Sequence, residues 1–119
     1  MITFYHKSNC ATSIAALQLL KKELKKTKEP LAVIEYLFNT PSEKELKAIL
    51  KMLNMKAEQL VRKKESVYKE NFEGKKLTNA QWIKILIKNP ILIERPVVIR
   101  NNKAIIARPP ESVIDFIRQ

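Results

Sequence analysis

Cys10 is the only cysteine in the chain and the residue with the clearest chemical potential. It lies between a short apolar run at residues 2–5, which predicts a strand, and a run with helical periodicity. The first N–H groups of a helix lack intrahelical partners and carry the positive end of its dipole, so a thiol there ionises more easily. The thiolate is the form that attacks electrophiles. Position alone leaves two interpretations open, a reactive thiol or a small buried apolar side chain.

Three arginines stand beside structural breaks and are candidates for binding an oxyanion. Arg95 precedes Pro96, Arg108 precedes Pro109, and Arg62 lies between predicted helices. A residue before proline is held in an extended conformation, so Arg95 and Arg108 should project from a well-fixed backbone. The planar guanidinium donates paired hydrogen bonds, which suit a tetrahedral oxyanion. Taken singly, each arginine is better explained as an ordinary surface ion pair.

Length and composition indicate one globular domain in the cytoplasm. The 119 residues are 45% hydrophobic, with Gly 1 and Pro 6. No stretch approaches the ~20 apolar residues that span a bilayer, so we expect no membrane association. The first residues lack the charged and apolar regions of a signal peptide. A single unpaired thiol is typical of a reducing compartment.

The charge is strongly basic, with 23 Lys and Arg against 12 Asp and Glu and a formal net charge of +11. Such a surplus favours anionic partners. The densest lysine run, at residues 21–28, falls at the end of the first predicted helix, where it is better read as a solvated helix end. No nucleic-acid-binding motif accompanies it, so nucleic acid is not the expected partner.

The first forty residues predict a βαβ unit. A strand at residues 2–5 is followed by a helix over about 11–27, with apolar residues at helical spacing, and by a second strand over 31–37. A connection of this length makes the two strands parallel. The apolar positions that predict the helix are Ile14, Leu17, Leu20 and Leu24.

The rest of the chain predicts a helical insertion and then a hairpin with a last helix. Ser42 with Glu45, and Thr78, are expected to cap helices of the insertion, which spans about 42–89. The runs 96–100 and 103–107, joined by the turn residues Asn101-Asn102, predict an antiparallel hairpin, and Pro109-Pro110 leads into the last helix. We therefore expect an α/β, thioredoxin-like fold in one domain over 1–119, with a four-stranded mixed sheet flanked by helices. Arg95 and Arg108 then lie at one edge of this sheet, and Arg95 should lie near Cys10.

Five ordered motifs, spread over nearly the whole chain, carry a family resemblance. They are Tyr5-His6 with Cys10; Tyr36-Leu37 with Thr40-Pro41-Ser42 and Glu45-Leu46; Leu60-Val61-Arg62-Lys63 with Tyr68; Asn89-Pro90-Ile91-Leu92-Ile93-Glu94-Arg95-Pro96-Val97-Val98; and Ala107-Arg108-Pro109-Pro110-Glu111. With these motifs the chain resembles the glutaredoxin-coupled arsenate reductases, an ArsC-like family of the thioredoxin-like superfamily.

The resemblance implies a role for each candidate residue. Cys10 would attack arsenate, Arg62, Arg95 and Arg108 would bind the oxyanion and keep Cys10 ionised, and Pro96 would be the cis-proline beside the cysteine. Glutathione would be the co-substrate and glutaredoxin the protein partner in arsenic detoxification. No metal and no tightly bound cofactor is implied, and we expect a monomer.

Two further residues are implied as supporting ones. Ser13 stands where a dithiol relative would carry its resolving thiol, which fits monothiol chemistry. Its hydroxyl has two other possible roles, a hydrogen bond to the Cys10 thiolate or a helix cap. His6 lies near the thiol in the family, where either a local hydrogen bond or the tuning of Cys10 would explain it.

Two other functions compete with arsenate reduction. One is a non-catalytic, Spx-like regulator whose basic surface binds an acidic partner such as RNA polymerase. Those regulators often carry Cys-x-x-Cys, whereas this chain has Cys10-Ala11-Thr12-Ser13. The other is a thiol reductase of the same fold with a different substrate.

Overall fold

The computed structural model describes residues 1–119 and contains one four-stranded mixed sheet. Its strands are β1 (Ile2–His6), β2 (Leu31–Glu35), β3 (Val97–Arg100) and β4 (Lys103–Ile106), in the order β2-β1-β3-β4. β1 is parallel to β2 and antiparallel to β3, and β3 is antiparallel to β4. The expected mixed sheet is therefore confirmed.

The hairpin between β3 and β4 turns at two asparagines, as expected. Asn101 and Asn102 have φ of 51° and 61°, the left-handed conformation that both central residues of a tight two-residue hairpin turn require. Asparagine tolerates this conformation better than most residues. The turn fixes the register of the hairpin, and its last paired residue, Ile106, lies two residues before Arg108.

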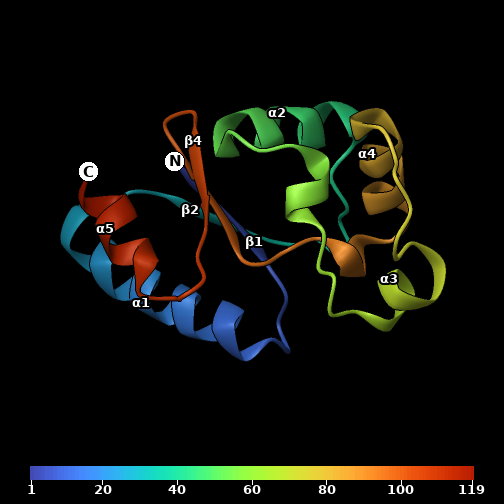
Figure 1. The fold of residues 1–119 in the computed structure, drawn as a ribbon. Coiled ribbons are helices and arrows are strands. Elements are labelled where there is room, and N and C mark those ends of the chain that lie inside the picture. Colours follow the sequence, from blue (N-terminus) through green and yellow to red (C-terminus); the bar gives the residue numbers. More distant parts are fainter. The chain divides into compact units, whose positions relative to one another are not determined.

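Two helices pack against the sheet and against each other, α1 (Ala11–Thr27) and α5 (Ser112–Arg118) (Figure 1). Their shared core contains apolar residues from β1, β3, both helices and the residue that follows β4: Ile2, Phe4, Ala16, Leu20, Leu24, Val98, Ala107, Val113, Phe116 and Ile117. The bounds of α1 match the prediction, but its buried stripe starts elsewhere. Ser13 and Ala16 are buried, whereas Ile14 is 39% exposed. One residue of displacement rotates a side chain by about 100° around a helix, which carries Ile14 out of the core.

The chain divides into two compact units. One comprises Met1–Asn39 and Arg95–Gln119 with the sheet, and the other is Thr40–Glu94. The second unit extends slightly beyond both ends of the predicted insertion at 42–89. It contains α2 (Glu43–Leu53), α3 (Ser66–Asn71) and α4 (Asn79–Lys88), with the short 3₁₀ helices η1 (Ala57–Leu60) and η2 (Pro90–Leu92). The expectation of a single domain stays a prediction.

Both predicted helix caps of the second unit are present. The N–H of Glu45 donates to Ser42 Oγ, and the Ser42 N–H donates to the Glu45 carboxylate, each over 3.1 Å. Thr78 and Gln81 form the same reciprocal pair at the start of α4. These bonds satisfy N–H groups that the first helical turn leaves without partners. They begin α2 at residue 43 and α4 at residue 79.

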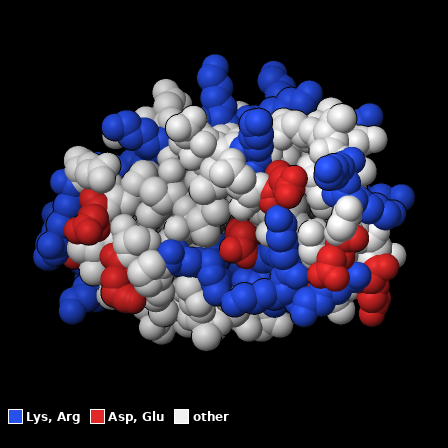
Figure 2. Space-filling view, in the orientation of Figure 1, with Lys and Arg blue, Asp and Glu red and all other residues white.

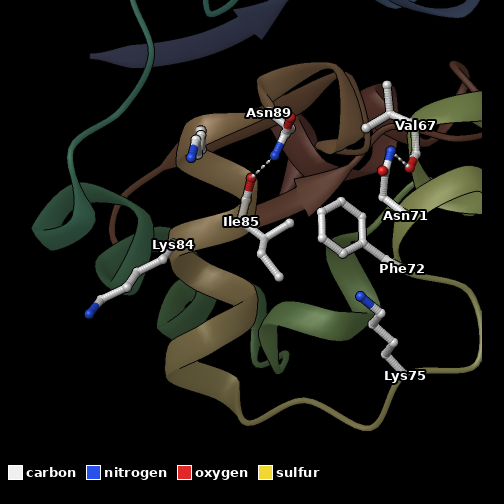
Figure 3. A pocket seen from close by; sticks show the side chains of 8 residues that line it. Val67, Asn71, Phe72, Lys75, Lys84, Ile85 and Asn89 are labelled. Atoms are coloured by element: carbon white, nitrogen blue, oxygen red, sulfur yellow. Dashed lines mark hydrogen bonds between the residues drawn. The ribbon is translucent and has the colours of Figure 1, made fainter.

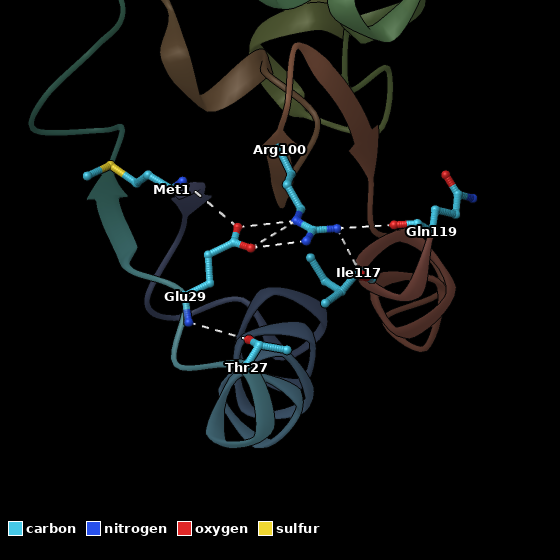
Figure 4. Close-up of polar contacts among 6 residues, drawn as sticks. All are labelled: Met1, Thr27, Glu29, Arg100, Ile117 and Gln119. Atoms are coloured by element: carbon cyan, nitrogen blue, oxygen red, sulfur yellow. Dashed lines mark hydrogen bonds and ion pairs between the residues drawn. The ribbon is translucent and has the colours of Figure 1, made fainter.

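An ion network joins distant parts of the first unit (Figure 4). The Arg100 guanidinium on β3 donates to both carboxylate oxygens of Glu29, over 3.1–3.2 Å, and to the main-chain oxygen of Ile117 over 3.0 Å. The amino group of Met1 lies 3.9 Å from the same carboxylate. The network therefore ties the chain start, the approach to β2 and the end of α5 to one strand.

Basic side chains outnumber acidic ones, 23 to 12 over the chain. Lysine and arginine are more prominent than aspartate and glutamate on the face drawn in Figure 2. None of the helices combines the length and apolar character needed to cross a membrane.

Candidate active site

Cys10 is the N-terminal cap residue of α1, as the sequence predicts. Its backbone is extended (φ −104°, ψ 120°), and its carbonyl accepts the N–H of Ile14 over 2.9 Å, the first bond of the helix. Its own N–H donates to the carbonyl of Lys7 over 3.0 Å, which closes the loop after β1. The thiol is partly exposed. The helix start therefore presents this sulfur to solvent-borne reactants rather than burying it.

The surroundings of the sulfur favour its anion. Burial raises the pKa of the Cys10 thiol, but hydrogen bonds from the Ser13 N–H, the Arg95 side chain and the Thr12 N–H, together with the Arg95 charge, outweigh burial and lower the pKa to about 7. About half of the thiol is then ionised at neutral pH. This is the reactive state that the helix-start position predicts.

Arg95 and Arg108 come together at the sheet edge, as expected from their places beside β3 and β4. Arg95 is 5% exposed, and its side chain hydrogen-bonds the Cys10 sulfur. Arg108 is exposed, and its Nη1 donates to the main-chain oxygen of Arg95 over 3.1 Å. The structure thus brings Cys10, Arg95 and Arg108 into one continuous set of contacts.

The Arg95–Pro96 peptide bond is cis, as the resemblance implies. The Arg108–Pro109 bond is also cis, although the resemblance implied only one cis-proline. The Ala107 N–H donates to the Pro96 carbonyl over 2.9 Å, so the two arginine–proline segments are joined through their backbones.

Ser13 links the end of β1 to the start of α1. Its Oγ lies 2.6 Å from His6 Nδ1 and accepts the Lys7 N–H over 3.2 Å. Ser13 is fully buried and does not cap the helix, because its hydroxyl serves these two groups and no side chain caps α1. The helix-cap alternative is therefore wrong. The hydrogen bond from Ser13 to the Cys10 sulfur comes from its backbone N–H.

His6 makes the local hydrogen bond that was one of its two expected roles. Burial lowers the pKa of His6 and the positive Lys21 adds to this effect, against an opposing contribution from the Glu35 carboxylate. The net lowering of the His6 pKa favours the neutral imidazole, which holds Ser13 through this hydrogen bond.

Arg62 belongs to the Thr40–Glu94 unit and pairs with two carboxylates there. Its Nε lies 3.3 Å from Glu65 Oε1, and its Nη1 lies 3.4 Å from Glu94 Oε1. Its N–H donates to the Leu92 carbonyl over 2.6 Å. The expectation that Arg62 joins the oxyanion site stays a prediction.

Glu35 also supports the Cys10 loop, although no sequence motif singled it out. Its Oε1 accepts the Ser8 N–H over 3.0 Å, and it lies opposite His6 in the β1–β2 pair. The signal was available, because residues at the carboxyl ends of two parallel neighbouring strands meet at one edge of a sheet. No group of three or more His, Cys, Asp or Glu side chains is placed to hold a metal ion.

Comparison with known proteins agrees with this architecture. The family model described as "ArsC family" matches residues 5–116. The uncharacterized protein YfgD of Escherichia coli is 38% identical over 98% of this chain and 96% of its own length, and an arsenate reductase of Haemophilus influenzae is 35% identical over 98% of both.

A solved structure shows the same fold over almost the whole length. A putative arsenate reductase from Yersinia pestis has a TM-score of 0.85 and 38% identity, covering 97% of this chain and 99% of its own. This likeness confirms the expected thioredoxin-like fold, with its four-stranded sheet and flanking helices. On its sequence, its fold and the extent of both matches, the chain belongs to the ArsC family.

Proposed function

We propose that this protein is an arsenate reductase in which Cys10 is the nucleophile. The observation that carries the proposal is the state of that sulfur: a thiol with a pKa of about 7, hydrogen-bonded by a buried guanidinium and by the start of a helix. Relatives named arsenate reductases, similar over nearly the whole chain, support the choice of substrate.

The first step would join sulfur to arsenic. The Cys10 thiolate attacks As(V), an S–As bond forms, and an arsenate oxygen leaves as water after protonation. Because arsenate is itself an anion, the approach of a thiolate is opposed by like charges. Arginine offsets this repulsion and stabilises the charge of the transition state. Arg95 lies against the sulfur and Arg108 beside Arg95, and we assign the oxyanion site to these two. Arg62 is kept as a further proposed donor on the family resemblance alone.

The second step would take its electrons from two sulfurs. A second thiolate attacks the Cys10 sulfur, the S–As bond breaks, and its electron pair stays with arsenic, which becomes As(III) and leaves as arsenite. The two sulfurs are oxidised to a disulfide. This chain has one cysteine, so the second thiol comes from another molecule. We propose glutathione in that role and a glutaredoxin to reduce the mixed disulfide, with no tightly bound cofactor, in the reducing cytoplasm.

His6, Ser13 and Pro96 would act by holding this site in shape. The His6–Ser13 bond fixes the residue whose N–H meets the sulfur, and Pro96 follows the arginine that contacts it. Their proposed role is positioning, since the reaction needs neither their protons nor their electrons.

The test is an assay in which arsenate reduction is coupled to NADPH oxidation through glutathione, glutaredoxin and glutathione reductase. We expect arsenate-dependent turnover that Cys10→Ser abolishes and that Ser8→Ala, a change at an exposed neighbour, preserves. Turnover with thioredoxin and not with glutaredoxin would contradict the proposed donor alone. A folded protein with no turnover from either donor would contradict the arsenate reductase and leave the regulator and a thiol reductase with a different substrate.

A further inference from the structure

A second candidate site lies within the Thr40–Glu94 unit, in a hollow of about 520 Å³. Its wall contains neither Cys10 nor any of the three arginines of the proposed oxyanion site. The volume falls within the range of pockets that hold small molecules, about 300–1,000 Å³. The proposed reduction of arsenate makes no use of this hollow, so an inference drawn from it stands independently.

The apolar part of the pocket consists of Val67, Phe72 and Ile85, from α3, the chain after it and α4 (Figure 3). The Phe72 ring packs edge-on against the buried indole of Trp82, with 6.0 Å between ring centroids. Trp82 in turn stacks on Tyr68 at 6.3 Å. The apolar surface is therefore fixed by a row of three aromatic rings, and a flat or branched apolar group can rest on it without rearrangement.

The charged part of the pocket is entirely basic. Lys75, Lys84 and Lys88 line it, all three exposed, and no acidic residue does. Lys84 and Lys88 are one turn apart on α4, so their like charges repel. None of the three takes part in a salt bridge; the lysines that do are Lys26, Lys47 and Lys63. An anion in the pocket would relieve this repulsion and meet no carboxylate.

The two asparagines of the pocket supply the remaining polar groups. The side-chain N–H₂ of Asn71 donates to the Val67 carbonyl over 3.0 Å, and that of Asn89 donates to the Ile85 carbonyl over 3.1 Å. These bonds fix the orientation of both amides and leave the second N–H of each as a donor that an anion can accept from. The pocket thus combines ammonium groups, amide N–H donors and an apolar wall.

We propose that this pocket binds a small organic anion: an aromatic or branched apolar body that carries one carboxylate, sulfonate or phosphate group. Contact of the body with Val67, Phe72 and Ile85 supplies most of the affinity, at about 25 cal/mol for each Å² of apolar surface removed from water. The positive charge of the lysines selects for the anionic group. It adds little to the affinity, because an exposed ion pair contributes only about 0–1 kcal/mol.

The probe for this proposal is 8-anilino-1-naphthalenesulfonate, a fluorescent aromatic sulfonate. Trp82 is the only tryptophan and packs on Phe72, so energy transfer from Trp82 reports a bound probe, and charge-reversal variants show whether it is bound at this pocket. The double variant Lys84→Glu, Lys88→Glu reverses the charge of the site. Its control is Lys22→Glu, Lys25→Glu, the same charge change on exposed lysines of α1. N-phenyl-1-naphthylamine, which lacks the sulfonate, serves as the neutral probe.

We expect saturable quenching of Trp82 with a matching rise in probe emission. The reversal at Lys84 and Lys88 should weaken sulfonate binding about tenfold, the size of a 1.4 kcal/mol loss. The control should change it less than twofold, and the neutral probe should bind equally to all three proteins. Absence of saturable transfer, or equal weakening by both double variants, would overturn the proposal. Because all four lysines are exposed, far-ultraviolet circular dichroism should show the same helix content in each protein.

Discussion

The chemistry of Cys10 depends on two neighbours that act in different ways. The start of α1 supplies backbone N–H groups, which the fold fixes and no side-chain mutation removes. Arg95 supplies a charged hydrogen-bond donor from a buried position. The first source explains why a cysteine at this helix start is ionisable. The second explains how an anionic substrate can approach an anionic sulfur.

The variant Arg95→Lys tests whether the charge of Arg95 is sufficient or whether the planar guanidinium is also needed. Lysine keeps the positive charge but loses the planar fork, so an oxyanion loses its paired hydrogen bonds. We expect kcat/KM for arsenate to fall roughly a hundredfold, as for loss of one donor to a transition-state oxyanion. The matched control is Arg118→Lys, an exposed arginine paired with Glu23, which should leave the kinetics unchanged. Equal activity of the Arg95 variant and the wild type would remove Arg95 from the oxyanion site.

Ser13→Ala tests the link between β1 and α1. The change removes the partner of buried His6 Nδ1 and the acceptor of the Lys7 N–H. A buried polar group left unpaired costs about 1–3 kcal/mol, so the free energy of unfolding should fall by that amount. Urea unfolding measures it. The control is Ser8→Ala, at an exposed serine. It should lower the free energy of unfolding by less than about 0.5 kcal/mol. Equal stability of both variants would show that the hydrogen bonds of the Ser13 hydroxyl do not stabilise the fold.

Elements with a strong local signal were predictable from the sequence. The bounds of α1, the capping pairs of Ser42 and Thr78, and the asparagine turn all depend on residues within four positions of one another. The buried stripe of α1 was predicted less well, because Ile14 fits the apolar spacing while the sheet selects the face that carries Ser13. The sequence of a helix does not by itself show which of two adjacent faces will be buried against its neighbour.

Ser42→Ala tests the cap that begins α2. The side-chain oxygen that accepts the Glu45 N–H is lost, and caps of this kind contribute about 1 kcal/mol. We expect the free energy of unfolding to fall by about this amount in urea. Ser66→Ala, at an exposed serine in α3 that caps nothing, is the control and should change stability by no more than a few tenths of a kcal/mol. A cost at Ser66 equal to that at Ser42 would contradict a capping role.

At the scale of the molecule, the positions of site residues could be predicted where the order of helices and strands fixes them. Contacts between residues far apart in the sequence could not be predicted. Cys10 at a helix start and Arg95 beside β3 follow from element order, and both were expected. The Arg62–Glu94 pair joins residues 32 positions apart, and only a folded backbone reveals it. The Glu29–Arg100 pair, 71 positions apart, is equally invisible in the sequence.

The Glu29–Arg100 network predicts how stability depends on pH. Hydrogen bonding to Arg100 lowers the pKa of Glu29 below its ordinary value, so the folded state holds the ionised carboxylate more strongly than the unfolded chain does. The stabilisation is therefore fully present above about pH 4.5 and is lost as the pH falls through the lower, folded value. Glu29→Gln should be less stable than the wild type at pH 7 and should converge with it towards pH 3. Thermal unfolding across this range measures both, and a constant difference at every pH would contradict the assignment.

The most direct test of the central claim is a titration of the single thiol, followed by the ultraviolet absorbance of the thiolate. Because Cys10 is the only cysteine, the signal reports one residue of the whole molecule. We predict a midpoint near the pKa of about 7 and a rise in that midpoint for Arg95→Gln, which removes the charge beside the sulfur. A wild-type midpoint at or above the ordinary thiol value of about 8.5, unchanged in the variant, would contradict the account.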